Sequence, residues 1–341
     1  MRLTRASRRL PAAAALAVTM LAAACSSQGT LSQGSPAQGS PGQGTPAVTR
    51  AAHLGMTNIT VGALPIVDDV ALYLAQKEGY FGQAGLHVTI KPVTQSTAAI
   101  PDMKSGSIDI IAGANYASFF QADATGAFKP TIVADAIACQ QDNDDILALP
   151  SSGITSPADL AGKTIAVNLT NNIQTLMINT VLRADNVNPA SVHYVAIPFP
   201  KMISALKAHK VDAISPVEPF ITQAELQAGA ETVLSECTGP TADFPLSGYI
   251  ASQSWAEKYP GTARAFQSAI ERAQALADSD RAAVEQILPT YSKISPEEAA
   301  IINLGEFPTT LDATHLQRAA NLMYTGGLLH AQLNVNSLLL H

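Results

Sequence analysis

The sequence has few charged residues, few aromatic residues and almost no cysteine. Charged residues occupy 14% and aromatic residues 5% of 341 positions, and there are three cysteines. No basic cluster occurs beyond residue 9, which excludes a nucleic-acid binder that needs a positive face. The absence of an apolar run of 18 residues excludes a multi-span membrane protein. Hydrophobic residues still make up 47%, enough for sizeable cores in about two domains.

The motifs that mark many enzymes and metal sites are also missing. No CxxC, HExxH, GxSxG or Walker sequence occurs. The seven histidines show no ligand-like spacing. We therefore expect no enzyme activity, no metal and no cofactor.

The first 25 residues have the pattern of a secretory signal. Four arginines precede an apolar stretch from Leu10 to Ala24, and Cys25 follows three alanines. This stretch resembles a bacterial lipobox, although the large aliphatic residue, Leu21, lies four places before the cysteine instead of three. The resemblance implies cleavage after residue 24 and a lipid anchor on Cys25. The alternative is an ordinary signal peptide with an incidental cysteine.

Residues 25–56 have the composition of a flexible linker. QGT or QGS recurs four times among Ser, Gly and Pro, and so little apolar mass cannot repay the entropy of folding. We expect a tether that holds a folded domain at the outer face of the bacterial cytoplasmic membrane. Without residues 1–24 the formal charge is 16 − 27 = −11, which argues against electrostatic binding to an anionic membrane.

From residue 57 onward, predicted strands alternate with predicted helices. A strand at 59–64 precedes a helix that begins near Val70 and ends at Gly79. The alternation predicts mostly parallel sheets covered by helices. A strand at 248–252 is expected to return to the first sheet before a helical tail. Further strands are expected at 87–93, 108–112, 131–138, 146–149, 164–167, 193–196 and 213–215.

Three ordered motifs resemble one family of binding proteins. The first has EGYF, GL and V within residues 78–88, and the second has DL, GK and AV within residues 154–167. The third has AL, VDA and EPF within residues 205–220, with His209 where glycine is usual. These motifs are similar to those of the solute-binding components of nitrate, sulfonate, taurine and thiamine-precursor ABC importers.

The resemblance implies an α/β, two-lobed, periplasmic-binding-protein-like fold of type II with a hinged central cleft. Lobe I would comprise residues 57–141 and 239–341, and lobe II residues 142–238. A monomer that closes on one small solute and delivers it to an ABC permease is expected. Relatives also include a thiamine-pyrimidine synthase and an aryl-sulfinate desulfinase, so an enzyme on this fold is one alternative. The synthase's Cys-rich iron motif is absent here. A lipid-anchored ligand sensor is the other alternative.

Several polar side chains follow predicted strands, where open α/β lobes bind their ligands. Helices that begin at Asn115 and Asn171 would direct free N–H groups into such a cleft. Each candidate also has a structural explanation, since Asn115 can be a helix cap and Glu218 can brace a proline turn. The candidate ligand-binding residues are Asp68, Asp69, Asn115, Tyr116, Asn168, Asn171, Asn172, Glu218 and Phe220.

The charges of these segments favour one kind of solute. They hold acids but no arginine, and Lys201 is the only lysine nearby. A sulfonate or nitrate is usually bound by cationic side chains. We expect a neutral or partly cationic organic solute, for example a heteroaromatic ring stacked on Tyr116 or Phe220. The alternative is an anion held by helix N-termini alone.

Two cysteines remain besides Cys25. Cys139 and Cys237 lie where the chain should leave and re-enter the first lobe, in an oxidising compartment. We expect a disulfide between them, and the alternative is two free buried thiols. The desulfinase alternative needs a nucleophilic thiol, which Cys139 would supply only if it were reduced.

Overall fold

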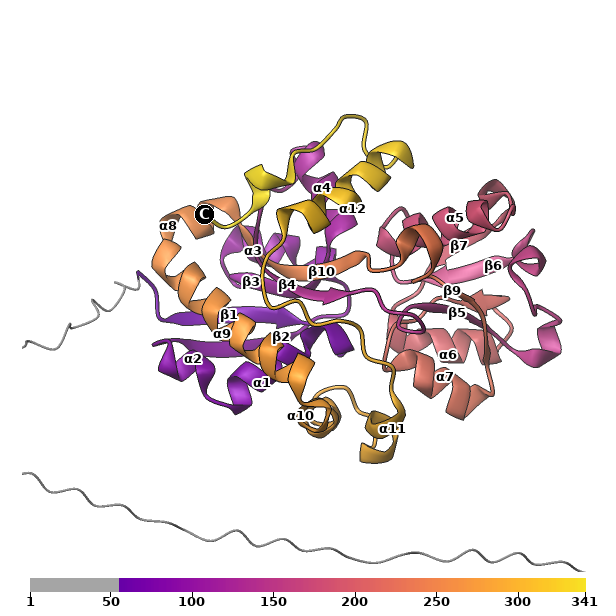
Figure 1. Ribbon diagram of the computed structural model, residues 1–341, viewed down its shortest axis with the longest axis horizontal. Coiled ribbons are helices and arrows are strands. Elements are labelled where there is room, and N and C mark those ends of the chain that lie inside the picture. Colours follow the sequence, from indigo (N-terminus) through magenta and orange to yellow (C-terminus); the bar gives the residue numbers. More distant parts are fainter. Residues whose placement is uncertain (1–54) are drawn as a thin grey trace, which may run out of the picture. The chain divides into compact units, whose positions relative to one another are not determined.

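The computed structural model describes residues 55–341, which form two mixed β-sheets with helices around each (Figure 1). Cys25 and nearly all of the predicted linker lie outside this range. Within it, no helix is both long and apolar enough to cross a membrane. The prediction of an α/β protein with two sheets is confirmed.

Sheet I has the strand order β2-β1-β3-β10-β4. Strand β1 runs parallel to β2 and β3, whereas β10 runs antiparallel to β3 and β4. The chain therefore returns to sheet I at β10 after it has built the other sheet. The strands are β1 (Asn58–Ala63), β2 (His87–Pro92), β3 (Ile110–Asn115), β4 (Pro130–Ala138) and β10 (Pro245–Ser252).

Sheet II has the order β7-β6-β8-β5-β9. Strand β6 runs parallel to β7 and β8, and β5 runs antiparallel to β8 and β9. We call sheet I with its helices lobe I and sheet II with its helices lobe II. The strands are β5 (Asp145–Ala148), β6 (Thr164–Val167), β7 (His193–Ala196), β8 (Ala213–Ile214) and β9 (Glu231–Ser235).

The sheets are mixed, although four of the five strands in each run in one direction, as expected. Strands β5 and β10 are the exceptions, because each enters its sheet directly from the other sheet and not through a covering helix. Strand β9 was not predicted. It lies at the edge of sheet II and only Leu234 of its five residues is buried, so the sequence carries no clear alternation there.

The helices begin and end where local signals place them. Asn115 caps α4 by accepting a hydrogen bond from the Ser118 N–H, and Asn172 caps α5 in the same way. Ser295 and Glu298 form the capping box of α11. The α-helices are α1 (Val70–Lys77), α2 (Tyr80–Gln83), α3 (Ile100–Ser105), α4 (Tyr116–Ala124), α5 (Ile173–Ala184), α6 (Phe199–Lys207), α7 (Phe220–Ala228), α8 (Gln253–Lys258), α9 (Pro260–Ser279), α10 (Arg281–Ile287), α11 (Pro296–Ile301) and α12 (Ala313–Thr325).

The hydrophobic cores cross the boundary between the lobes at two places. Leu64 and Ile66, which follow β1 of lobe I, pack into a core cluster of lobe II. Ile173, Leu176 and Met177 of α5 pack in turn into the large core of lobe I. The two lobes therefore touch through apolar side chains on both sides of their junction. The predicted residue boundaries of the lobes stay a prediction.

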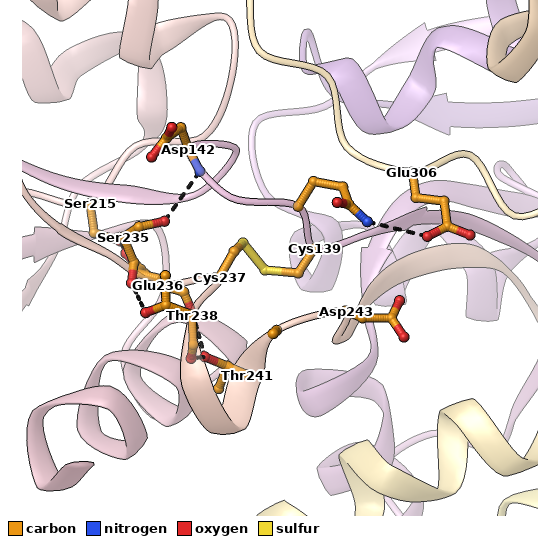
Figure 2. Close-up of a disulfide and its surroundings, with 12 residues drawn as sticks. Cys139, Asp142, Ser215, Ser235, Glu236, Cys237, Thr238, Thr241, Asp243 and Glu306 are labelled. Atoms are coloured by element: carbon orange, nitrogen blue, oxygen red, sulfur yellow. Dashed lines mark hydrogen bonds between the residues drawn. A yellow bond between two sulfur atoms is a disulfide. The ribbon is translucent and has the colours of Figure 1, made fainter.

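The two chain segments that pass between the sheets lie side by side (Figure 2). Cys139 directly follows β4 and Cys237 lies two residues after β9, and the structure joins their sulfur atoms in a disulfide. Their Cα atoms are 5.4 Å apart and 98 positions separate them in the sequence. Both side chains are buried.

Candidate functional site

A cavity of about 40 Å³ lies between the lobes and is lined by residues of both. At about 10–15 Å³ for each water, it has room for about three water molecules. Its wall includes the segments that follow β1, β6 and β8, which agrees with the rule that ligands lie beyond strand ends. Lobe I contributes the polar side chains of Asp68, Ser96, Asn115 and Ser247, and lobe II contributes Asp144, Asn168, Asn172 and Gln174.

Four of the nine predicted ligand-binding residues line this cavity. They are Asp68 and Asn115 of lobe I, and Asn168 and Asn172 of lobe II. Asn115 and Asn172 both serve as helix caps, so each has one amide oxygen engaged with its own helix. Whether any of the four contacts a solute stays a prediction.

Three of the other five candidates are engaged elsewhere. The carboxylate of Asp69 is buried and accepts a hydrogen bond from the Leu64 N–H at 2.7 Å. Asn171 is exposed, and its carbonyl oxygen accepts from the Gln121 side chain at 2.7 Å. Glu218 is buried and accepts from the N–H groups of Thr222 and Asn303, both at 3.1 Å.

The two aromatic candidates are turned into the cores. Tyr116 is fully buried and its hydroxyl donates a hydrogen bond to Asp135. Phe220 stacks on Phe199, with ring centroids 6.0 Å apart. Neither residue lines the cavity, so the cavity wall does not support the expected stacking of a solute on these rings. The aromatic ring in the cavity wall is that of Phe199.

Sequence reasoning missed several residues of the wall. Asp144 stands in a run of acids before a predicted strand, and Ser247 lies in the returning strand β10. Gly113 had a readable signal, since an isolated glycine at the end of a buried strand suggests a close approach. Its φ is +56°, and a Cβ there would lie 2.9 Å from an Asp69 oxygen.

A buried hydrogen-bond chain runs from the cavity toward the disulfide. The Gln174 side-chain oxygen accepts from the Asn168 N–H at 2.8 Å, and its nitrogen donates to the Ser215 carbonyl at 2.6 Å. The Ser215 hydroxyl donates to Glu236 at 2.6 Å, and Glu236 directly precedes Cys237 (Figure 2). The chain links the floor of the cavity to the segment that leaves lobe II.

The cavity lies within a group of buried acids. Burial raises the pKa of Asp68, and burial together with the charges of Glu236 and Asp68 raises the pKa of Asp144. Burial also raises the pKa of Glu218 to about 7 and that of Glu236 to about 8. No lysine, arginine or histidine lines the cavity among the described residues. The acids that face the cavity therefore have no cationic side chain to stabilise their ionised forms.

Hydrogen bonds join the lobes around the cavity, in addition to the bond from the Asn303 N–H to Glu218. The Gln95 side chain of lobe I donates to the Asn168 carbonyl at 2.8 Å. Gln121 of α4 donates to the Asn171 carbonyl, as noted above, and the Val67 N–H donates to the Glu218 carbonyl at 3.1 Å. The structure therefore holds the lobes against each other at the rim of the cavity.

The cavity does not present a ready-made metal site. Among residues 55–341, the group of three potential ligand side chains within reach of one ion is Cys139, Asp144 and Cys237. The two cysteines are joined in a disulfide and so offer no thiolate.

Comparisons with known proteins match the chain to one family model and to a curated binding protein. The model of the NMT1/THI5-like family matches residues 68–282. The nitrate/nitrite binding protein NrtA of Nostoc sp. is 25% identical over 303 residues, which cover 81% of this chain and 68% of that protein.

Solved structures share the fold. The alkanesulfonate-binding protein SsuA from Xanthomonas axonopodis pv. citri, bound to MOPS, has a TM-score of 0.69 at 19% identity, over 83% of this chain and 98% of that one. The desulfurization enzyme DSZB has a TM-score of 0.64 at 15% identity, over 83% and 96%. The two-lobed fold of binding proteins is thereby confirmed, and an enzyme is among the proteins that share it.

Proposed function

The chain belongs to the NMT1/THI5-like family, and we propose that it is the solute-binding component of an ABC importer. The observation that carries this proposal is the cavity whose wall comes from both lobes. The nitrate-binding and alkanesulfonate-binding relatives are binding proteins, which supports the same reading. The solute would be captured between the lobes and passed to a membrane permease.

Hinge motion is the proposed mechanism of capture. The lobes are connected by the segments after β4 and after β9, and the disulfide ties these two segments together at one point. A rotation about this point would separate the rim contacts of Gln95 and Gln121 from lobe II and open the cavity. The solute would then stabilise the closed state by its contacts to both walls.

The place of action follows from the sequence. We propose that the signal peptide is removed, that Cys25 carries the lipid, and that the linker holds a monomer at the outer face of the cytoplasmic membrane. A single acyl chain anchors weakly, so stable anchoring requires more than one chain.

An enzyme of the desulfurization type is the second candidate, because DSZB shares the fold. Residues 55–341 contain two cysteines, and the structure joins both in the disulfide. A nucleophilic thiol is therefore missing from the part of the chain that the structure describes. We propose binding without turnover.

Native mass spectrometry tests this function. Protein purified from its own cells without dialysis should carry one small molecule per chain, and that molecule should rebind unchanged after release. Small-angle scattering should show compaction when the solute is returned to the emptied protein. Release of a chemically altered product would establish an enzyme, and a chain that never carries a small molecule would refute the proposal.

A further inference from the structure

We infer that the cavity takes a compact organic cation with N–H groups, such as an amidinium or a primary ammonium. The inference rests on the proposed function and names the class of solute. It is carried by two acidic side chains that face the cavity without a cationic partner, and by a buried amide in the same wall that has no partner either.

Asp144 is the first of these groups. Its side chain is 5% exposed and lines the cavity, and no hydrogen bond from the described residues reaches its carboxylate. Asp68 lines the opposite wall, where one of its oxygens accepts from the Ser247 hydroxyl. Burial of a carboxylate costs free energy unless a cation or hydrogen-bond donors compensate it. The two acids therefore favour a ligand that brings both.

Asn168 is the second, independent observation. Its side chain is 7% exposed and lines the same cavity, and its amide oxygen has no hydrogen-bond partner. Buried polar atoms are nearly always satisfied in folded proteins. An N–H group of a bound solute would satisfy this oxygen at the same time as it approaches Asp144.

The surroundings offer no competing positive charge from side chains. The ion pairs of residues 55–341 all lie outside the cavity wall, and Lys201 is exposed and not part of it. Glu218 and Glu236 add further acid close by, because both act on Asp144. A solute cation is the partner that this group of acids lacks.

Helix N-termini are the argument for an anion. Helices α4 and α5 begin at the cavity, and each N-terminus carries about half a positive charge. Their caps, Asn115 and Asn172, already accept from the first turns. The caps therefore already occupy N–H groups of these termini, whereas the carboxyl group of Asp144 has no hydrogen-bond partner among the described residues, so the wall prefers a cation.

A metal ion fits the wall less well than an organic cation. The group of three potential metal ligands among residues 55–341 contains Asp144 but not Asp68. Calcium and magnesium need six or more oxygen ligands at short distances. An amidinium instead spreads its N–H groups in a plane and can bridge acceptors on two walls.

A matched series of probes tests the charge. Acetamidinium, acetamide and acetate have the same number of heavy atoms and the same shape, and they carry charges of +1, 0 and −1. We expect isothermal titration of the full chain at neutral pH and low salt to show acetamidinium binding at least tenfold tighter than acetamide or acetate. Nitrate, methanesulfonate and calcium chloride serve as further arms.

Two variants locate the binding. Asp144→Asn should weaken acetamidinium binding at least tenfold, and Asp68→Asn should do the same. Asp145→Asn is the matched control, because Asp145 is equally buried on the next residue but bonds to Thr232 and does not line the cavity. Its affinity for acetamidinium should stay within twofold of the unchanged protein.

Every other outcome overturns the inference. Tighter binding of acetate, nitrate or methanesulfonate would assign the cavity to an anion, and tighter binding of calcium would assign it to a metal. Both would leave the proposed solute-binding function standing. Absence of binding by all probes would also overturn the charge assignment, while the function would still be decided by the native mass of the purified protein.

Discussion

The two sheets share one strand pattern but are assembled from the chain in different ways. Each has three parallel strands, then an antiparallel strand, then a strand antiparallel to that one. In lobe II the antiparallel strand β5 comes first, so its strands form one continuous stretch from residue 145 to 235. In lobe I the corresponding strand is β10, which arrives last. Lobe I therefore cannot be completed until lobe II has been traversed.

Because of this difference, the disulfide affects the assembly of both lobes. It joins the segment that enters lobe II to the segment that leaves it, and so closes lobe II into one loop. It also brings the start of β10 back toward the end of β4, its neighbour in sheet I. The same covalent link thus bounds the continuous lobe and helps to complete the discontinuous one.

Removal of the disulfide should give the largest effect on stability. With 98 positions between the cysteines, the chain-entropy model assigns about 4–5 kcal/mol to the link. Cys139→Ser with Cys237→Ser should lower the unfolding free energy by about that amount in denaturant titrations. Mass spectrometry of the unchanged protein under non-reducing conditions provides the control, and two alkylatable thiols in it would contradict the pairing.

Replacement of Gly248 in the returning strand β10 by alanine should destabilise lobe I. A Cβ at Gly248 would collide with the Tyr116 hydroxyl and would lie 2.8 Å from the Ala134 carbonyl oxygen. Gly248→Ala should therefore cost on the order of 3 kcal/mol. Gly153→Ala is a control for the loss of glycine in lobe II, since nothing lies within 4 Å there and only its φ of +71° opposes alanine. Equal losses of unfolding free energy in the two variants would contradict a steric constraint that is specific to β10.

The buried acids of lobe II should make the protein less stable as the pH rises. Glu218, with a pKa of about 7, and Glu236, with a pKa of about 8, bind protons in the folded chain at pH values where the unfolded chain has released them. The unfolding free energy should therefore fall steadily as the pH rises from about 4.5 to about 8.

Melting temperatures measured across this range test the direction of the change. Glu236→Gln should flatten the decline, because it removes one of the two titrating groups and keeps an acceptor for Ser215. Exposed Glu297, at the start of α11, gives a control variant, Glu297→Gln, with an unchanged slope. A melting temperature that rises steadily from pH 5 to pH 8 would contradict the raised pKa values.

The smallest effect is expected at the rim between the lobes. Gln121→Ala removes one hydrogen bond to lobe II, worth about 0.5–1.5 kcal/mol. Solute affinity should fall by about two- to tenfold, since the closed state loses a contact. Gln253→Ala removes a comparable bond to Glu257 within lobe I and should leave the affinity unchanged. An equal loss of solute affinity in both variants would show that the hydrogen bond from Gln121 does not contribute to closure.

Most of the fold could be predicted from the sequence because the signals for its helices and strands are local. Strand and helix periodicity, the Asn115 cap and the capping box at Ser295 all lie within one element, and the structure reproduces them. The antiparallel direction of β5 and β10 could not be predicted because strand orientation depends on the path between lobes, which no local pattern encodes. Edge strand β9, with one buried residue, left no periodic trace.

Only part of the cavity wall could be predicted from the sequence. Asn168 directly follows β6 and Asp68 lies in the segment after β1, so position alone identified them as part of the wall. Tyr116 does not line the cavity because its hydroxyl donates to Asp135, which is 19 positions away on strand β4. Asp144 was overlooked because its neighbours are also acidic, and only the packing of β5 distinguishes the one that faces the cavity.

A crystal structure of the protein with its solute tests the central claim most directly. The solute isolated from the purified protein should lie in the cavity between the lobes, in contact with Asp68 of lobe I and with Asp144 and Asn168 of lobe II. A solute bound to one lobe alone, or at a site outside this cavity, would contradict the claim that the two lobes capture it together.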